Sequence, residues 1–181
     1  YLEQAAQERD PGAQLELGRL LTARRDQKAD MLAGLQHLQK AAVSGNAAAM
    51  LALAELPGES LQSTGRTALD WRKTAADAGS ARAAIALASA TKNDTEAAHW
   101  LSRAEALPVC AARDMIDLAQ NHQKLPGSDH RERAGIWMKR ALAEIENGAK
   151  DPSILFQLGR AMIDGVGGVG SKQEALTYIK L

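Results

Sequence analysis

A five-residue motif recurs along the chain and restricts its fold more than any other feature. In each copy a residue with a ring side chain is followed four positions later by alanine. The copies are Tyr1 to Ala5, His37 to Ala41, Trp71 to Ala75, Trp100 to Ala104 and Trp137 to Ala141, and a sixth begins at Tyr178. On a helix the two residues lie on the same face. Successive ring residues are 29 to 41 positions apart, a period typical of stacked-repeat proteins.

The composition is that of a folded protein with balanced charge. Of the 181 residues, 45% are hydrophobic and 24% are charged, which excludes a disordered or fibrous chain. Lys and Arg together number 22, and so do Asp and Glu. The excess of positive charge that is typical of proteins binding nucleic acid or anionic membranes is therefore missing, and no apolar run is long enough to cross a bilayer. We therefore expect no nucleic acid partner and no membrane insertion by this segment.

Helical patterns and turn residues alternate between the ring motifs. Pro57 and Gly58 interrupt one helical pattern, and the segment AAVSGN at 41–46 returns as AADAGS at 75–80. Each repeat is therefore predicted to be a helix, a turn and a second helix. Both ends of the chain lie inside a repeat, which indicates a cut from a longer array. We expect one array over residues 1–181, with the second helix of a cut repeat at 1–10 and repeats at 11–46, 47–80, 81–107, 108–149 and 150–181, the last truncated.

Apolar residues at helical spacing predict which side chains are buried in the first repeat. The first helix pattern gives Ala13, Leu17, Gly18, Leu20 and Leu21, and the second gives Leu32, Leu35, Leu38, Ala41 and Ala42. Gly45 follows the second pattern, at a place where a left-handed residue commonly ends a helix. In the second repeat, the residues from Pro57 to Gly65 are expected to form a polar loop.

The last repeat resembles the Sel1-like repeat family. The residues that carry the resemblance are Leu158, Gly159, Met162, Gly165, Gly167, Val169, Ala175 and Tyr178. In the first repeat, Leu17, Gly18, Lys40, Ala41, Ala42 and Gly45 match the same pattern. Ala54, Ala88 and Ala119 stand where the family has glycine, so the middle repeats are equally similar to tetratricopeptide-like repeats. The resemblance implies an all-α fold, a right-handed α-solenoid of antiparallel helix hairpins.

The ring residues are expected to pack where successive hairpins meet. In a stacked-repeat protein each ring would insert between the first helix of its own repeat and that of the next, and the small alanine would let the backbones approach. This structural repeat joint consists of Tyr1, His37, Trp71, Trp100, Trp137 and Tyr178. The alternative is an aromatic platform on which a ligand stacks.

A second set of positions is expected to line a concave groove where a partner binds. Counting from Leu17, Leu53, Leu87, Leu118 and Leu158, the positions five before, one before and two after lie on one helix face. The predicted partner-binding residues among them are Glu16, Arg19, Glu55, Arg82, Arg113, Asp117, Gln120, Gln157 and Arg160. Of these, Arg82, Arg113 and Arg160 are the candidates to hold carboxylates of an acidic peptide or helix. The alternative is a helix face that meets only solvent.

Patterns typical of catalysis or metal binding are missing from the sequence. The residues from Gly165 to Lys172 lack the Gly-Lys-Ser or Gly-Lys-Thr order of a phosphate loop. The histidines, which lack the spacing of a metal site, are His37, His99, His122 and His130. Residues 129–132 are interpreted as a solvated loop and Cys110 as a buried structural thiol. We therefore expect no catalytic residue, no cofactor, no bound metal and no enzyme activity.

The resemblance implies a non-catalytic scaffold or adaptor that holds other proteins together. Its relatives include scaffolds of bacterial envelope complexes, such as the outer-membrane lipoprotein of alginate export. We therefore expect a role in a multiprotein complex for polysaccharide secretion or envelope assembly, in the bacterial periplasm or envelope, with the cytoplasm as the alternative. Two other functions stay open, a regulatory or docking domain attached to an enzyme or signalling protein, and a carbohydrate-binding repeat protein.

Overall fold

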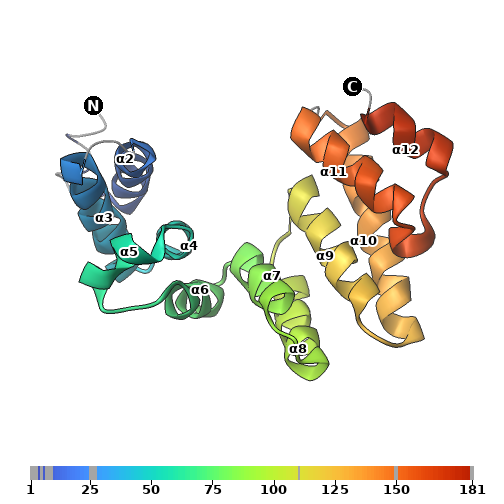
Figure 1. Ribbon diagram of the computed structural model, residues 1–181, viewed down its shortest axis with the longest axis horizontal. Coiled ribbons are helices and arrows are strands. Elements are labelled where there is room, and N and C mark those ends of the chain that lie inside the picture. The colour runs from blue at the N-terminus through green and yellow to red at the C-terminus, as the bar shows by residue number, and fades with distance from the viewer. Residues whose placement is uncertain are drawn as a thin grey trace. The chain divides into compact units, whose positions relative to one another are not determined.

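The computed structural model describes residues 4, 6, 10–24, 28–109, 111–148 and 151–179. Throughout this part of the chain the regular structure is helical and no strand occurs (Figure 1). The first ring residue, Tyr1, and the only cysteine, Cys110, lie outside the described residues, so the predictions made for them stay predictions. The chain divides into unit 1, Tyr1–Leu87, and unit 2, Ala88–Leu181, which are described one at a time.

Unit 1 consists of helix hairpins. Its elements are α2 (Pro11–Ala23), α3 (Lys28–Val43), α4 (Ala47–Ala54), α5 (Gly58–Leu61), the 3₁₀ turn η1 (Gln62–Thr64), α6 (Ala68–Asp77) and most of α7 (Ala81–Ala90). Helix α2 packs on α3, α4 packs on α6, and α3 packs on α4. Each hairpin is thus a pair of neighbouring helices, as predicted, and the second hairpin rests on the first.

Unit 2 repeats this plan. Its elements are α8 (Asp94–Glu105), α9 (Ala112–Lys124), α10 (Ser128–Glu146), α11 (Pro152–Ile163), the turn η2 (Val166–Gly168) and α12 (Lys172–Ile179). Helix α9 packs on α10 and α11 packs on α12, while α9 and α11 touch across the two hairpins. The first helices of successive hairpins are therefore neighbours.

Short polar side chains begin several of these helices. The Asp10 carboxylate accepts a hydrogen bond from the Ala13 N–H at 2.7 Å, and Asn46 caps α4 in the same way. At the start of α6, Thr67 and Asp70 form a reciprocal capping box, which satisfies two backbone donors that a helix leaves unpaired. Gly45 has φ +85° just after α3, which confirms the predicted left-handed helix end.

The ring motifs provide buried alanines and three buried tryptophans. The alanine of the motif is 0% exposed in all four copies that the structure describes, which are Ala41, Ala75, Ala104 and Ala141. The exposed fraction is 6% for Trp71, 8% for Trp100 and 6% for Trp137. His37 and Tyr178 are half-buried. The alanine position is therefore the most uniformly buried part of the motif.

Glycine in the first helix of a hairpin allows a close approach to the second helix. A Cβ on Gly18 would lie 2.7 Å from Leu38 Cγ, and one on Gly159 would lie 2.6 Å from Ile179 Cγ1. These are the two glycines of the family-like Leu-Gly pair. The alanines at the same position in the middle repeats, Ala54, Ala88 and Ala119, are all buried, so those hairpins accommodate one more methyl group.

The buried face of α2 differs from the predicted stripe. Its buried residues are Gln14, Leu15, Gly18 and Thr22, whereas Leu20 is 59% exposed. Two polar side chains are buried because each has a backbone partner. Gln14 Nε2 donates to the Ala6 carbonyl at 3.3 Å, and the Thr22 hydroxyl donates to the Gly18 carbonyl at 2.9 Å. A prediction from apolar spacing overlooks such residues, and only Gly18 of the predicted set is fully buried.

The predicted buried residues of α3 are largely confirmed, whereas the predicted loop after α4 is not. In α3 the predicted buried residues are confirmed at four of five positions, and Leu32 is the exception at 56% exposed. The polar loop predicted from Pro57 to Gly65 was wrong, because α5 and η1 lie there and Leu61 is 2% exposed. Leu61 gives this connection a buried apolar anchor.

The glycine-rich turn of the last repeat packs on the hairpin before it. Turn η2 lies against α10 and α9, and the Gly167 N–H donates to Gln123 Oε1 at 3.2 Å. Gly167 has φ +65°, and a Cβ there would lie 2.7 Å from the Gly135 Cα. Glycine is therefore required at position 167 both by backbone conformation and by the contact with α10.

Candidate functional site

In unit 1 the predicted groove residues form ion pairs with one another. Glu16 and Arg19 are 3.5 Å apart on α2, and Arg82 of α7 is 3.9 Å from Glu55. All four side chains are about half exposed, so each pair contributes little to stability. A partner carboxylate at Arg82 would compete with Glu55.

In unit 2 the predicted groove residues lie on the neighbouring helices α9 and α11. Gln157 Nε2 donates to Asp117 Oδ1 at 2.5 Å, which joins the two helices. Gln120 is half-buried, while Arg113 and Arg160 are exposed. Of the unit 2 members of the predicted set, Asp117 and Gln157 are therefore in contact, while the two arginines are exposed to solvent.

Asp151, just before α11, adds a negative charge near Arg113. The Ser153 hydroxyl and N–H both donate to Asp151 Oδ1, at 2.7 and 2.8 Å. These hydrogen bonds, with a smaller effect of the Arg113 charge, lower the pKa of the Asp151 carboxyl. Near the start of α11, the surface formed by the predicted groove residues thus carries the negative charge of Asp151 and the positive charge of Arg113. Arg160 adds a positive charge further along α11.

Phe156 occupies a repeat position that is buried in every other hairpin. Two residues before the reference leucine of each first helix, the exposed fractions are 8% for Leu15, 8% for Leu51, 3% for Ile85 and 0% for Ile116, but 50% for Phe156. Phe156 is also the one aromatic residue outside the ring motifs. A large exposed ring at a position that otherwise packs indicates a surface to which another helix can dock.

Phe156 belongs to a short apolar and basic surface on α11. Arg160 and Ile163 follow it by four and seven positions, so the three side chains share one helix face. Ile163 is 36% exposed, and on the adjacent helix α12 Leu176 is 45% exposed. We call Phe156, Arg160 and Ile163 the α11 face.

The three tryptophans are covered by arginines. The guanidinium carbon lies over the ring at 4.8 Å for Arg66 on Trp71, 5.2 Å for Arg103 on Trp100 and 4.4 Å for Arg140 on Trp137. Such cation–π contacts occupy the ring surface that a stacking ligand would need. The geometry therefore favours the packing role of the ring motif over the ligand platform.

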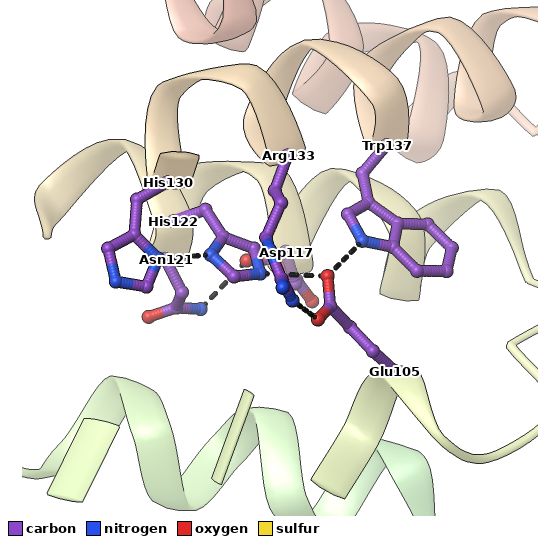
Figure 2. Close-up of polar contacts among 7 residues, drawn as sticks. All are labelled: Glu105, Asp117, Asn121, His122, His130, Arg133 and Trp137. Carbon is purple, nitrogen blue, oxygen red and sulfur yellow. Dashed lines mark hydrogen bonds and ion pairs between the residues drawn. The ribbon is translucent and has the colours of Figure 1, made fainter. Parts of the chain in front are cut away.

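A polar cluster in unit 2 joins three helices (Figure 2). His122, near the end of α9, is 1% exposed; its Nε2 lies 3.1 Å from Glu105 Oε1, at the end of α8. Its Nδ1 lies 3.0 Å from Nδ1 of His130, in the first turn of α10. Trp137 Nε1–H donates to Glu105 Oε1 at 2.8 Å, and Arg133 pairs with the other carboxylate oxygen.

The Glu105 carboxylate is held ionised. Burial acts to raise its pKa, but the hydrogen bonds from His122 and Trp137 and the charges of His122 and Arg133 outweigh burial and lower the pKa to about 2. Glu105 thus links the end of α8 to α9 and to α10. Trp137 reaches the preceding hairpin through this bond, a contact that the sequence did not predict.

The sequence analysis also missed the pairing of His122 with His130. They are eight positions apart, one on each side of the turn at Pro126 and Gly127, so an antiparallel hairpin must bring them close. The turn residues between them were the available signal. Although histidine and carboxylate together can act as a catalytic pair, a ring that is 1% exposed is out of reach of a substrate. In the described residues no group of three or more histidine, cysteine or carboxylate side chains could hold a metal.

His37, the ring residue of the first repeat, borders an open hollow in unit 1. The hollow has a volume of about 760 Å³ and is lined by Ala6, Gln14, Gln36, His37, Gln39, Lys40, Val43 and Ser44. His37 Nδ1 is buried without a hydrogen-bond partner among the described residues. Burial, and then the charge of Lys40, lower the pKa of His37, so the ring is held neutral.

Two solved structures resemble the chain in fold. One is c5321, a protective antigen present in uropathogenic Escherichia coli strains and displaying an SLR fold; it is 20% identical, with a TM-score of 0.62 over 99% of this chain and 39% of that one. The other is a Sel1 repeat protein from Oxalobacter formigenes, 21% identical, with a TM-score of 0.63 over 99% of this chain and 75% of that one. The chain thus spans well under two thirds of the Escherichia coli protein.

These similarities establish the fold and leave the activity to be argued from the chain itself. The predicted all-α solenoid of helix hairpins is confirmed, because both structures cover 99% of the chain. No protein-family model and no curated protein sequence matches the chain. Within the described residues, none of the helices has the length and apolar character needed to cross a bilayer.

Proposed function

We propose that this chain, which has the Sel1-like repeat fold, is a non-catalytic scaffold that holds other proteins against the exposed faces of its helices. Stacked helix hairpins offer a rigid, extended surface for such contacts. The observation that supports the proposal best is the exposure of Phe156 at a position where the other four hairpins bury an aliphatic side chain. Because the equivalent side chains are buried in the other four repeats, the exposed Phe156 ring leaves apolar surface that another helix can cover.

The α11 face determines what kind of partner fits. Phe156 and Ile163 offer apolar contacts one on each side of Arg160, which presents a guanidinium. The matching partner is an amphipathic helix with an apolar stripe and a carboxylate between its apolar residues. The guanidinium can bind that carboxylate through two parallel hydrogen bonds, while burial of the two apolar side chains supplies most of the affinity.

The groove residues of α9 form a secondary contact region in this proposal. Arg113 and Gln120 lie on the helix next to α11, and the hydrogen bond between Gln157 and Asp117 fixes the two helices side by side. A partner helix that extends to the N-terminal end of α11 would meet Arg113, whose charge acts on Asp151 there. In unit 1 the corresponding Arg82 is paired with Glu55, so we place the main contact on α11.

The same proposal extends to the cellular setting. We infer a multiprotein complex at the bacterial envelope, with this chain in the periplasm or attached to the envelope. Both structures that support the fold are bacterial proteins, and one is a protective antigen of a pathogenic strain. The carboxylate-bearing helix of the partner would belong to another component of that complex.

The test selects helical peptides from a displayed library against the purified chain and measures their affinity. We expect peptides with an apolar stripe and an acidic residue, whose binding weakens about tenfold or more, or about 1.4 kcal/mol, in the Phe156→Asp and Arg160→Glu variants. The matched control is Leu69→Asp on α6, since Leu69 is 46% exposed outside the α11 face. Equal affinity for wild type and Phe156→Asp, or no enrichment of acidic amphipathic peptides, would rule out the proposed site.

A further inference from the structure

The turn between α9 and α10 is held by a pair of histidines. His122 lies in the last turn of α9 and His130 in the first turn of α10 (Figure 2). Pro126 and Gly127 lie between them in the sequence. Helix α10 starts after Gly127 with no side chain capping its first turn. The contact between the two rings is a polar contact that joins the two sides of this turn.

The two rings meet edge to edge. Their Nδ1 atoms are 3.0 Å apart, while the ring centroids are 5.2 Å apart and the planes make an angle of 28°. Rings stacked face to face would bring their centroids much closer than this. The arrangement is that of a hydrogen bond in which one Nδ1 donates and the other accepts.

Glu105 fixes one side of this bond. Its carboxylate is ionised, with a pKa of about 2, and an ionised carboxylate only accepts hydrogen bonds. Nε2 of His122, which is 3.1 Å away, must therefore carry a proton. The proton that lies between the rings is therefore carried by Nδ1 of one of the two histidines.

One proton fits between the two Nδ1 atoms, and two do not. With the pair neutral, His130 donates to His122. With one positive charge on the pair, the proton between the rings is still single, whichever ring carries the charge. A second positive charge would place N–H groups of both rings in the same gap of 3.0 Å, which loses the hydrogen bond and brings two like charges close together.

The charges around the pair come from α8 and α10. Burial lowers the pKa of His130 below its ordinary value of 6.5, and the positive charges of His122 and Arg133 lower it further. Asp129 and Glu105 act in the opposite direction with smaller effect. Because the unfolded chain binds a proton at His130 more readily than the folded chain does, the stability gained at this site falls as pH drops below 6.5.

We propose that His122 and His130 form an acid-sensitive clamp on the α9–α10 turn. The clamp is closed while the pair carries no more than one positive charge and opens when the second proton binds. Glu105 stays ionised through this step, so its bonds to Trp137 and Arg133 persist while the turn loosens. The opening is thus local to the end of α9 and the start of α10.

The decisive variant removes the titrating ring on the more accessible side. In His130→Asn the midpoint of thermal unfolding at pH about 7.5 drops by a few degrees, but its further decrease between about pH 7 and about pH 5 is at most half that of wild type. The matched control is His99→Asn, because His99 is exposed and is not part of the cluster. It should keep the full wild-type decrease. An undiminished acid response in His130→Asn would overturn the clamp.

A measurement on the wild-type chain does not depend on how the variant folds. Side-chain ¹⁵N resonances of His130, followed by NMR as pH falls, should show its protonation below the ordinary histidine pKa of 6.5, with the amides from 122 to 130 exchanging faster as the charge appears. The Trp137 indole N–H should keep its shift through that step. Amide exchange that does not change as His130 becomes protonated would contradict the proposal.

Discussion

The side chains of Gln157 and Asp117 are joined by a hydrogen bond of 2.5 Å across 40 residues of sequence. They occupy the same position in successive repeats, one residue before the reference leucine of α11 and of α9. Part of the surface predicted to face a partner is therefore used to hold two neighbouring helices together. The exposed remainder of the predicted surface includes Arg160, and Phe156, which was not predicted, is exposed four residues before it.

Gln157→Ala should destabilise unit 2 modestly. The change removes one charge-assisted hydrogen bond, which is worth about 1.5 to 3 kcal/mol, although partial exposure of both side chains will reduce the loss. Urea denaturation at neutral pH measures it. Arg160→Ala, three residues further along the same helix, is the control and should stay within about 0.5 kcal/mol of wild type. Equal stability of the two variants would show that the bond contributes nothing.

Trp71→Ala should cost about 3 to 5 kcal/mol, because a large ring that is 6% exposed leaves a cavity. The Arg66 guanidinium over that ring would lose its partner as well. Leu69→Ala removes an apolar side chain two residues earlier that is 46% exposed, and it should change stability much less. Urea denaturation gives the free energy of unfolding of both variants. A small loss of stability in Trp71→Ala would argue against a packing role for the ring motif.

Gly159→Ala should destabilise the last hairpin by about 1 to 3 kcal/mol, although alanine is the better helix former. The added methyl group would lie 2.6 Å from Ile179 Cγ1 and 2.8 Å from the Ala175 carbonyl oxygen. Hydrogen exchange of the α12 amides is the most local measurement and should accelerate. Gly58→Ala, at a position where an added Cβ meets no atom within 4 Å, is the matched control. Unchanged α12 protection would mean that the two helices can separate without cost.

Glu105→Gln should alter the response to strong acid. The folded pKa of Glu105 is about 2, below its ordinary value of 4.5, so its ionised form stabilises the fold above pH 4.5 and this contribution is lost as pH falls towards 2. The variant should be less stable than wild type at pH about 7, and the difference should shrink as pH falls through that range. Unfolding by urea at several pH values tests this, and a constant difference would place the effect elsewhere.

The periodic parts of the fold were predictable from the sequence. Helix α7 begins at Ala81, the first residue of the predicted repeat 81–107, and the alanine of the ring motif is fully buried wherever the structure describes it. These features depend on spacing alone. The predicted stripe of α2 failed because Gln14 and Thr22 are buried through hydrogen bonds to the backbone, which no hydropathy pattern records.

The candidate sites were harder to predict, because they depend on neighbours distant in sequence. Arg160 was identified from its place on the helix, but the exposure of Phe156 became visible only by comparing the same position in all five first helices. The bond between His122 and His130 depends on the length and direction of the α9–α10 turn. The spacing in the sequence predicts at which end of its helix each histidine lies. It does not predict the orientation of the two rings.

Because Gly135 and Gly167 are in contact, the residue type that is tolerated at one of these positions depends on the residue at the other. Because each position tolerates no side chain facing the other, neither residue can be exchanged alone without shifting the turn that carries Val166. A relative with a larger residue at position 135 must therefore have a differently built connection before its last helix. Covariation of these two sites across related sequences would record that dependence.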